Sequence, residues 1–266
     1  MIKDIIKVGL LPLVRCLFFS PFTFFLFCFS VFLPFHALAQ IGEHRSDFAI
    51  GVTGGYIFSN VNFSPTVAQG YHGGMTGGIA MRYTCEKYFK TICSLVAEVN
   101  YSALGWKEEI KTRQDKAVIG DRGVAEKYER TINYIQIPAF AHLAWGRETQ
   151  GFSYFLNLGP QFGIYLSDKI SKTYDEANVS EEDGRSNTVI YQETTPIDKK
   201  FDYGITVGAG IEYSHHSMGH FLVEARYYYG LGNIFNDSKR DYFGNSNFRN
   251  IVVKATYFFD VVKSHK

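Results

Sequence analysis

The strongest constraint on what this chain can fold into is a strict period of two in its C-terminal half. Over residues 201–213 every second side chain is apolar, and the positions between them hold glycine, threonine or the acids Asp202 and Glu212. Successive side chains of a β-strand point to opposite faces of a sheet. The segment is therefore predicted to be a strand with one apolar face and one small or polar face.

A similar alternation occurs in seven further segments, and the rest of the chain after residue 40 shows no pattern of a long helix. After residue 40 no apolar run approaches the roughly 18 residues of a membrane helix, and no long segment has a helical repeat. The chain is therefore predicted to be all-β, with eight strands at residues 48–58, 71–83, 94–104, 134–145, 152–167, 201–213, 221–231 and 250–259.

The connections between these strands alternate between long and short. The long ones are 59–70, 105–131, 168–200 and 232–247, and the short ones are 85–93, 146–151 and 214–219. Consecutive connections of an antiparallel meander lie at opposite ends, so one rim has the long loops and the other has the short turns. This asymmetry is typical of an antiparallel up-and-down transmembrane β-barrel, here eight-stranded.

A soluble eight-stranded barrel with an apolar interior has the same periodicity and is the main alternative. Two features favour the membrane barrel. Aromatic residues such as Phe201, Tyr213 and Phe221 lie near the ends of the apolar faces, where interfacial girdles form. The opposite faces combine glycine with charge, as at Gly208 and Glu212, which suits a narrow polar lumen.

The first 39 residues have the order of a secretory signal. Lys3, Lys7 and Arg15 precede an uncharged stretch that ends in Ala37-Leu38-Ala39. This order predicts a signal peptide at 1–39 and a barrel domain at 40–266, in the outer membrane of a Gram-negative bacterium. A retained membrane anchor is the alternative, because the uncharged stretch is long enough to span a bilayer.

The charged residues are predicted to lie in the lumen and to form ion pairs there. The chain has 27 basic and 26 acidic residues, so no basic excess suggests a nucleic-acid partner. If the polar faces point inward, seven charges share one lumen: Arg82, Glu98, Asp202, Glu212, Glu224, Arg226 and Lys254. Because unpaired charges in a narrow interior are costly, we expect them to pair as a plug, with an ion or proton path as the alternative. Arg226 is expected to lie near Gly208 and Gly210 and to reach Glu212.

Other reactive residues give weaker signals. Cys85 and Cys93 flank a short connection in an oxidising compartment, which predicts a hairpin-closing disulfide, with two free thiols as the alternative. His215, His216 and His220 lie at another short turn, but no complementary ligand set accompanies them, so no metal is expected. No Ser/His/acid spacing indicates an enzyme, and no cofactor is expected.

Short motifs of glycine and aromatic residues recur through the predicted barrel. They are GVTGG at 51–55 with FSN at 58–60, EVNYS at 98–102, YIQIP at 134–138, LGPQFG at 158–163, FDYG at 201–204 and ARYYYGL at 225–231. Together they resemble the PorT-type outer-membrane β-barrel family of the Bacteroidetes. The resemblance implies an eight-stranded barrel with a signal peptide, in a family named for a member linked to type IX secretion. The Cys85/Cys93 pair and the residues that follow Phe259 depart from that family's pattern.

The sequence therefore predicts a monomeric, non-enzymatic barrel in contact with outer-membrane lipid, with a plugged, salt-bridged lumen. It would act structurally or by binding a protein through loops 105–131 and 168–200. Three alternatives stay open: an accessory component of type IX protein secretion, a small diffusion pore, and a lipid-modifying outer-membrane enzyme.

Overall fold

The computed structural model describes residues 42–112, 114–119, 123–148, 150–174 and 191–264. Within these residues the chain forms eight strands and one short helix, α4 (Tyr191–Thr194). The strands are β1 (Glu43–Ser64), β2 (Gly70–Tyr88), β3 (Thr91–Glu109), β4 (Lys127–Gly146), β5 (Gly151–Lys172), β6 (Phe201–His215), β7 (Gly219–Gly230) and β8 (Asn245–Val262). The predicted signal peptide at 1–39 lies outside the described residues.

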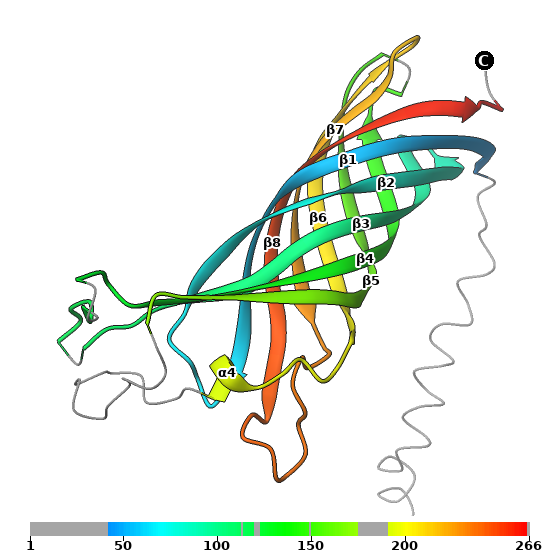
Figure 1. Cartoon of the computed structure of the whole chain (residues 1–266). Coiled ribbons are helices and arrows are strands. Elements are labelled where there is room, and N and C mark those ends of the chain that lie inside the picture. Colours follow the sequence, from blue (N-terminus) through cyan, green and yellow to red (C-terminus); the bar gives the residue numbers. More distant parts are fainter. Residues whose placement is uncertain (1–41, 113, 120–122, 149, 175–190, 265–266) are drawn as a thin grey trace, which may run out of the picture. The chain divides into compact units, whose positions relative to one another are not determined.

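The strands form a closed barrel in sequence order (Figure 1). Each strand pairs antiparallel with the next, and β8 closes the ring on β1, with Thr256 opposite Thr53. This architecture confirms the predicted all-β, eight-stranded, antiparallel up-and-down barrel. No helix among the described residues is long and apolar enough to cross a membrane.

The connections have the predicted parity. Residues 89–90, 147–150 and 216–218 join strands at one end, which we call the short-turn end. Residues 65–69, 110–126, 173–200 and 231–244 join them at the other, the long-loop end. The strand ends were predicted less well, because β1 continues past residue 58 to Ser64 by pairing with the start of β8. The connection predicted at 59–70 is therefore short.

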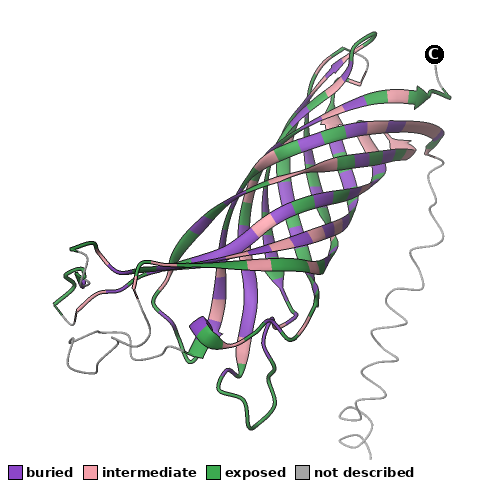
Figure 2. Ribbon diagram, in the orientation of Figure 1, coloured by how far each residue is buried: buried purple, intermediate pink, exposed green. Residues whose placement is uncertain are grey.

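The two faces of the strands separate by chemistry, and the polar face points inward. Exposed and buried residues alternate along every strand (Figure 2). The outward residues of β6 include Ile205, Val207 and Ile211, each about half exposed, whereas Asp202 and Glu212 on the same strand are buried. A soluble barrel of this size would bury its apolar face, so the arrangement is that of a barrel surrounded by lipid.

The lumen is organised in layers along the barrel axis. An aromatic core that includes Trp106, Phe235 and Phe248 fills the long-loop end. A layer of buried charges lies below it, followed by a smaller apolar cluster around Phe155 and Phe258. At the short-turn end the lumen opens into a pocket.

A charge on the outer face distinguishes the lipid-surrounded barrel from a soluble one. Val207 lies in the middle of β6 and points outward. Val207→Arg should lower the free energy of unfolding in lipid vesicles by about 2 to 4 kcal/mol, because the guanidinium must enter the hydrocarbon layer. The measurement is urea unfolding followed by the mobility difference between folded and unfolded protein on a detergent gel.

The matched control is Ser217→Arg, in the exposed turn 216–218, where no loss is expected. A Val207→Arg barrel that is as stable as the wild type would contradict the membrane orientation of this face.

Candidate functional site

The middle of the lumen holds a network of ion pairs centred on Glu98 of β3. The guanidinium of Arg226 donates two hydrogen bonds to the Glu98 carboxylate, at 2.9 and 2.7 Å. The Lys254 ammonium donates a third at 2.6 Å, and the Asn100 amide a fourth at 2.8 Å. Glu98 is 1% exposed, so this carboxylate has no access to water and depends on these donors.

A second carboxylate completes the network. Glu224 Oε1 lies 2.7 Å from Arg226 Nε and accepts a hydrogen bond from the Asn157 amide at 2.7 Å. Two acids and two bases therefore meet, and their formal charges cancel. A glycine makes the approach possible: a Cβ at Gly208 would lie 2.3 Å from Glu224 Oε1 and 2.9 Å from Arg226 Cγ.

Glu212 belongs to a separate group nearer the short-turn end. Its carboxylate accepts a hydrogen bond from Arg82 at 2.8 Å and lies 2.7 Å from His220 Nδ1. The predicted contact between Arg226 and Glu212 is therefore wrong. Arg226 lies opposite Gly208, and Glu212 is four residues further along β6, so the guanidinium crosses the lumen to β3 instead.

Asp202 is the one predicted lumen residue that the fold keeps apart from the bases. The Tyr228 hydroxyl donates to its Oδ2 at 2.6 Å, and no described basic side chain forms an ion pair with it. Asp202 is buried at the long-loop end of β6, beside the aromatic core rather than in the charge network. Six of the seven predicted charges thus fall into two paired groups, and the seventh accepts from a tyrosine.

The aromatic core at the long-loop end was not predicted from the sequence. The Phe63 ring packs edge-on to Trp106 at 5.2 Å, and Phe235 and Phe243 reach it from the connection 231–244. Arg130 lies among these rings, 5.7 Å from the Trp106 ring and ion-paired with Asp168 at 2.7 Å. The only sequence signal was a set of large apolar residues inside a connection that should otherwise be polar.

The long connections are tied across this end of the barrel. Arg130 donates to the carbonyl of Thr195 at 2.7 Å, which fixes the segment after α4 over the lumen. Lys199 lies 2.7 Å from Asp237, so the connections 173–200 and 231–244 are joined by an ion pair. The Lys199 ammonium holds the pKa of the exposed Asp237 carboxyl below its ordinary value.

The charged side chains of the middle layer are at most 6% exposed: Glu98, Glu224, Arg226 and Lys254. A void of about 20 Å³ next to Asn100, Gln161 and Lys254 has room for about one water molecule. The lumen is therefore packed by side chains through its middle, as expected of eight strands.

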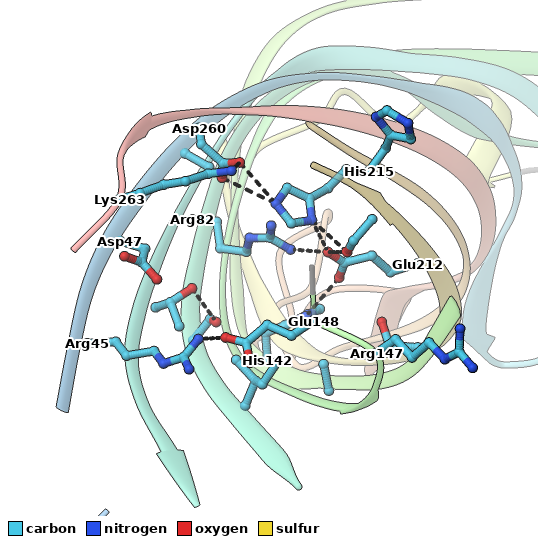
Figure 3. Close-up of a pocket in the computed structure, with 18 of the residues that line it drawn as sticks. Arg45, Asp47, Arg82, His142, Arg147, Glu148, Glu212, His215, Asp260 and Lys263 are labelled. Atoms are coloured by element: carbon cyan, nitrogen blue, oxygen red, sulfur yellow. Dashed lines mark hydrogen bonds and ion pairs between the residues drawn. The ribbon is translucent and has the colours of Figure 1, made fainter. Parts of the chain in front are cut away.

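The short-turn end holds a pocket of about 700 Å³ (Figure 3). Glu212 lies at its floor, and Asp260 and Lys263 of the β8 end line its side. Arg45 pairs with Glu148 across the mouth. Most carboxylates of this pocket form ion pairs with basic side chains of the same pocket.

A serine, a histidine and an acid meet in this pocket, which spacing along the chain did not reveal. His220 Nδ1 lies 2.9 Å from Ser214 Oγ, and His220 Nε2 lies 3.2 Å from Asp260. A general base must be a neutral imidazole with one nitrogen free to accept a proton. Here Glu212 and Asp260 lie against the two nitrogens, which suits an imidazolium that donates to both. His220 therefore bridges two carboxylates, whereas His216 is exposed in the turn 216–218.

The predicted disulfide between Cys85 and Cys93 is wrong for this structure, in which both thiols are free. The register explains why. Cys93 pairs with Glu86, and the ladder between β2 and β3 shifts between Thr84 and Glu86. The extra residue at this irregularity is Cys85, so the two cysteines are not cross-strand partners.

A strand edge at the long-loop end is the second candidate site. β5 pairs with β4 as far as Lys172, but with β6 only as far as Ile164 (Figure 1). Beyond the hydrogen bond from Tyr165 N to Lys200 O, residues 166–171 have no backbone partner on that side within the described chain. Their free N–H and C=O groups, with the exposed side chains of Leu166 and Ile170, form an open edge.

Comparisons with known proteins point to one broad class. Residues 38–236 match the family described as "Outer membrane protein beta-barrel domain". No curated protein sequence matches the chain.

Solved barrels are similar in fold at low identity. Ail of Yersinia pestis, solved with the heparin analogue sucrose octasulfate, has 13% identity and a TM-score of 0.33, with 80% of this chain and 99% of that one covered. Neisserial surface protein A has 14% identity and a TM-score of 0.39, with 82% and 100% covered. OprG of Pseudomonas aeruginosa has 12% identity and a TM-score of 0.40, with 82% and 98% covered.

The charge network makes a direct prediction about stability. Arg226→Ala removes the two hydrogen bonds that Glu98 accepts from the guanidinium and takes the base away from Glu224. The free energy of unfolding should fall by about 3 to 5 kcal/mol, because buried carboxylates lose their partner. Urea unfolding in lipid vesicles measures the change.

Two further variants sharpen this test. Arg147→Ala, at an exposed arginine of a short turn, should leave stability unchanged. The double variant Arg226→Met/Glu98→Leu should recover most of the loss, because Lys254 and Glu224 then remain as a neutral pair. An unfolding midpoint of Arg226→Ala equal to that of the wild type would show that these charges are hydrated.

Proposed function

We propose that this chain, which belongs to the family of outer membrane protein β-barrel domains, is a sealed monomeric barrel that binds an extracellular partner at its long-loop end. The observation that carries the proposal is the contrast between a lumen packed with side chains and an open strand edge at 166–171. This contrast favours binding at the cell surface over transport of a solute through the lumen.

The protein is located in the outer membrane of a Gram-negative bacterium, as its family is. Barrels of this membrane have short periplasmic turns and long extracellular loops. We therefore assign the long-loop end to the outside and the short-turn end to the periplasm. We also infer that residues 1–39 are removed as a signal peptide during export.

The lumen gives no support to a diffusion pore. A solute that enters from the periplasm meets Glu212 and Arg82, then the ion pairs around Glu98, and then the aromatic core with Trp106 at its centre. The imidazole of His220, held between two carboxylates, likewise gives no support to a hydrolytic enzyme at the periplasmic pocket. The two ends of the barrel then remain as the regions where a partner can bind.

The edge of β5 has the chemistry of a strand-addition site. An extended segment of a partner can pair with free backbone groups on an exposed strand, and alternate side chains then provide specificity. Lys169 lies on this exposed segment between Leu166 and Ile170, so a partner strand with apolar and acidic residues fits it best. The described residues of the neighbouring loops 110–126 and 173–200, which replace the predicted 105–131 and 168–200, extend the contact surface.

Photo-crosslinking in intact cells tests this proposal. A photoreactive amino acid in place of Lys169 should give adducts with an extracellular or surface protein. The matched control is the same residue in place of Lys87, which lies near the opposite rim on β2. It should give no adduct with surface proteins.

Two results would contradict the proposal. Adducts from position 169 with periplasmic proteins alone would mean that the barrel is inserted the other way. The absence of adducts from 169 and from both long loops would remove the binding role.

A second candidate function comes from the sequence motifs at 158–163 and 225–231, which resemble the PorT-type family of the Bacteroidetes. On this reading the barrel is an accessory component of type IX secretion, and its partner is another part of that machinery. A deletion strain should then retain type IX cargo proteins inside the cell. Normal cargo export in that strain would eliminate this candidate and leave the external binding role.

A further inference from the structure

The outer face of the barrel has a sharp chemical boundary at its long-loop end. On β1 the outward residues change from Phe58 to Asn60, and on β8 they change from Ile251 to Arg249. The register places Arg249 opposite Asn60 on one side and opposite Tyr229 of β7 on the other. Two adjacent strands, β1 and β8, thus end their apolar band at the same line, and the aromatic Tyr229 of β7 lies at that line, where the bilayer interface is expected.

Arg249 differs from the buried arginines of this barrel in its ion pairing. Arg45, Arg82, Arg130 and Arg226 each form an ion pair with a carboxylate. No described carboxylate pairs with Arg249, although its Nε is buried and has no hydrogen-bond partner. Its guanidinium lies 5.4 Å from the ring centre of Tyr229, which holds it against the outer wall.

The neighbouring side chain also has unused hydrogen-bonding capacity. Oδ1 of Asn60 is buried and accepts no hydrogen bond. The oxygen and nitrogen of an amide exchange places by a rotation of the side chain, so Asn60 can present either an acceptor or a donor at this position. A guanidinium fork beside an amide is a group suited to the oxygens of a phosphate.

We propose that Arg249, Asn60 and Tyr229 form a binding site for the phosphate group of an anionic lipid in the outer leaflet. The lipid is favoured over a free anion because the site lies on the outward face, directly above the apolar residues Phe58, Tyr227 and Ile251. Acyl chains of a bound lipid would lie along these residues while the phosphate meets the guanidinium. The site is on the wall of the barrel and is independent of the strand edge at 166–171.

Native mass spectrometry of the folded barrel tests the site directly. The barrel is released from uncharged detergent micelles that contain phosphatidic acid, and the bound-lipid fraction is titrated against lipid concentration. Arg249→Gln should weaken binding about tenfold, since it removes charge-assisted hydrogen bonds to the phosphate. Arg249→Lys keeps the charge without the fork and should recover only part of the affinity.

Controls separate this site from general electrostatics and from free phosphate. Arg147→Gln, an exposed arginine at the short-turn rim, should bind phosphatidic acid as the wild type does. An equal loss in Arg147→Gln, or no loss in Arg249→Gln, would overturn the proposal. Inorganic phosphate that displaces the lipid at equal concentration would show that the site takes a free anion and would overturn the lipid assignment. The detergent-gel mobility shift confirms that each variant is folded.

Discussion

The contact between Arg226 and Glu98 is the interaction on which the rest of the barrel interior depends. Two charged groups face each other across a narrow lumen at hydrogen-bond distance, and each is almost fully buried. Each charge is costly to bury without an opposite charge beside it, because the interior has no room for a hydration shell. Lys254 and Glu224 extend the pair into a neutral group of four. The glycine at 208 supplies the volume that the group occupies.

This pairing determines where the protein can act. The middle of the lumen is filled by charges that pair with each other, and the connection 231–244 folds over it and buries Phe235 and Phe243 against Trp106. Among the described residues, three places then offer groups to water or lipid: the pocket at the short-turn end, the open edge of β5 and the outer wall at Arg249. The first is occupied mainly by its own ion pairs, and the other two have unsatisfied groups. Both proposals therefore concern the outside of the barrel.

The sequence predicted the features that repeat along the strands, but it did not predict the contacts between side chains on opposite sides of the lumen. The period of two at residues 201–213 is a local property of the chain, so it separated an apolar face from a face that holds Glu212 and Gly208. The aromatic residues near the ends of the apolar faces, and the combination of glycine with charge on the opposite faces, then favoured the membrane barrel with the polar face inside. The alternation of long and short connections predicted that the long loops lie at one end of an antiparallel meander and the short turns at the other. The partners of Arg226 could not be predicted in this way, because they depend on the stagger of strands far apart in sequence. The same is true of Cys85, whose pairing with Cys93 is lost through a one-residue irregularity in the ladder. The aromatic core was missed because an apolar residue such as Phe243 inside a connection carries no periodicity.

A closed lumen conducts no ions, and planar-bilayer recording of the purified wild-type barrel measures this. We expect no steady conductance at any moderate voltage, with the membrane insertion of the barrel verified separately. Stable ohmic current whose ion selectivity reverses in Lys254→Glu would show that ions pass the charge network and that the lumen is open.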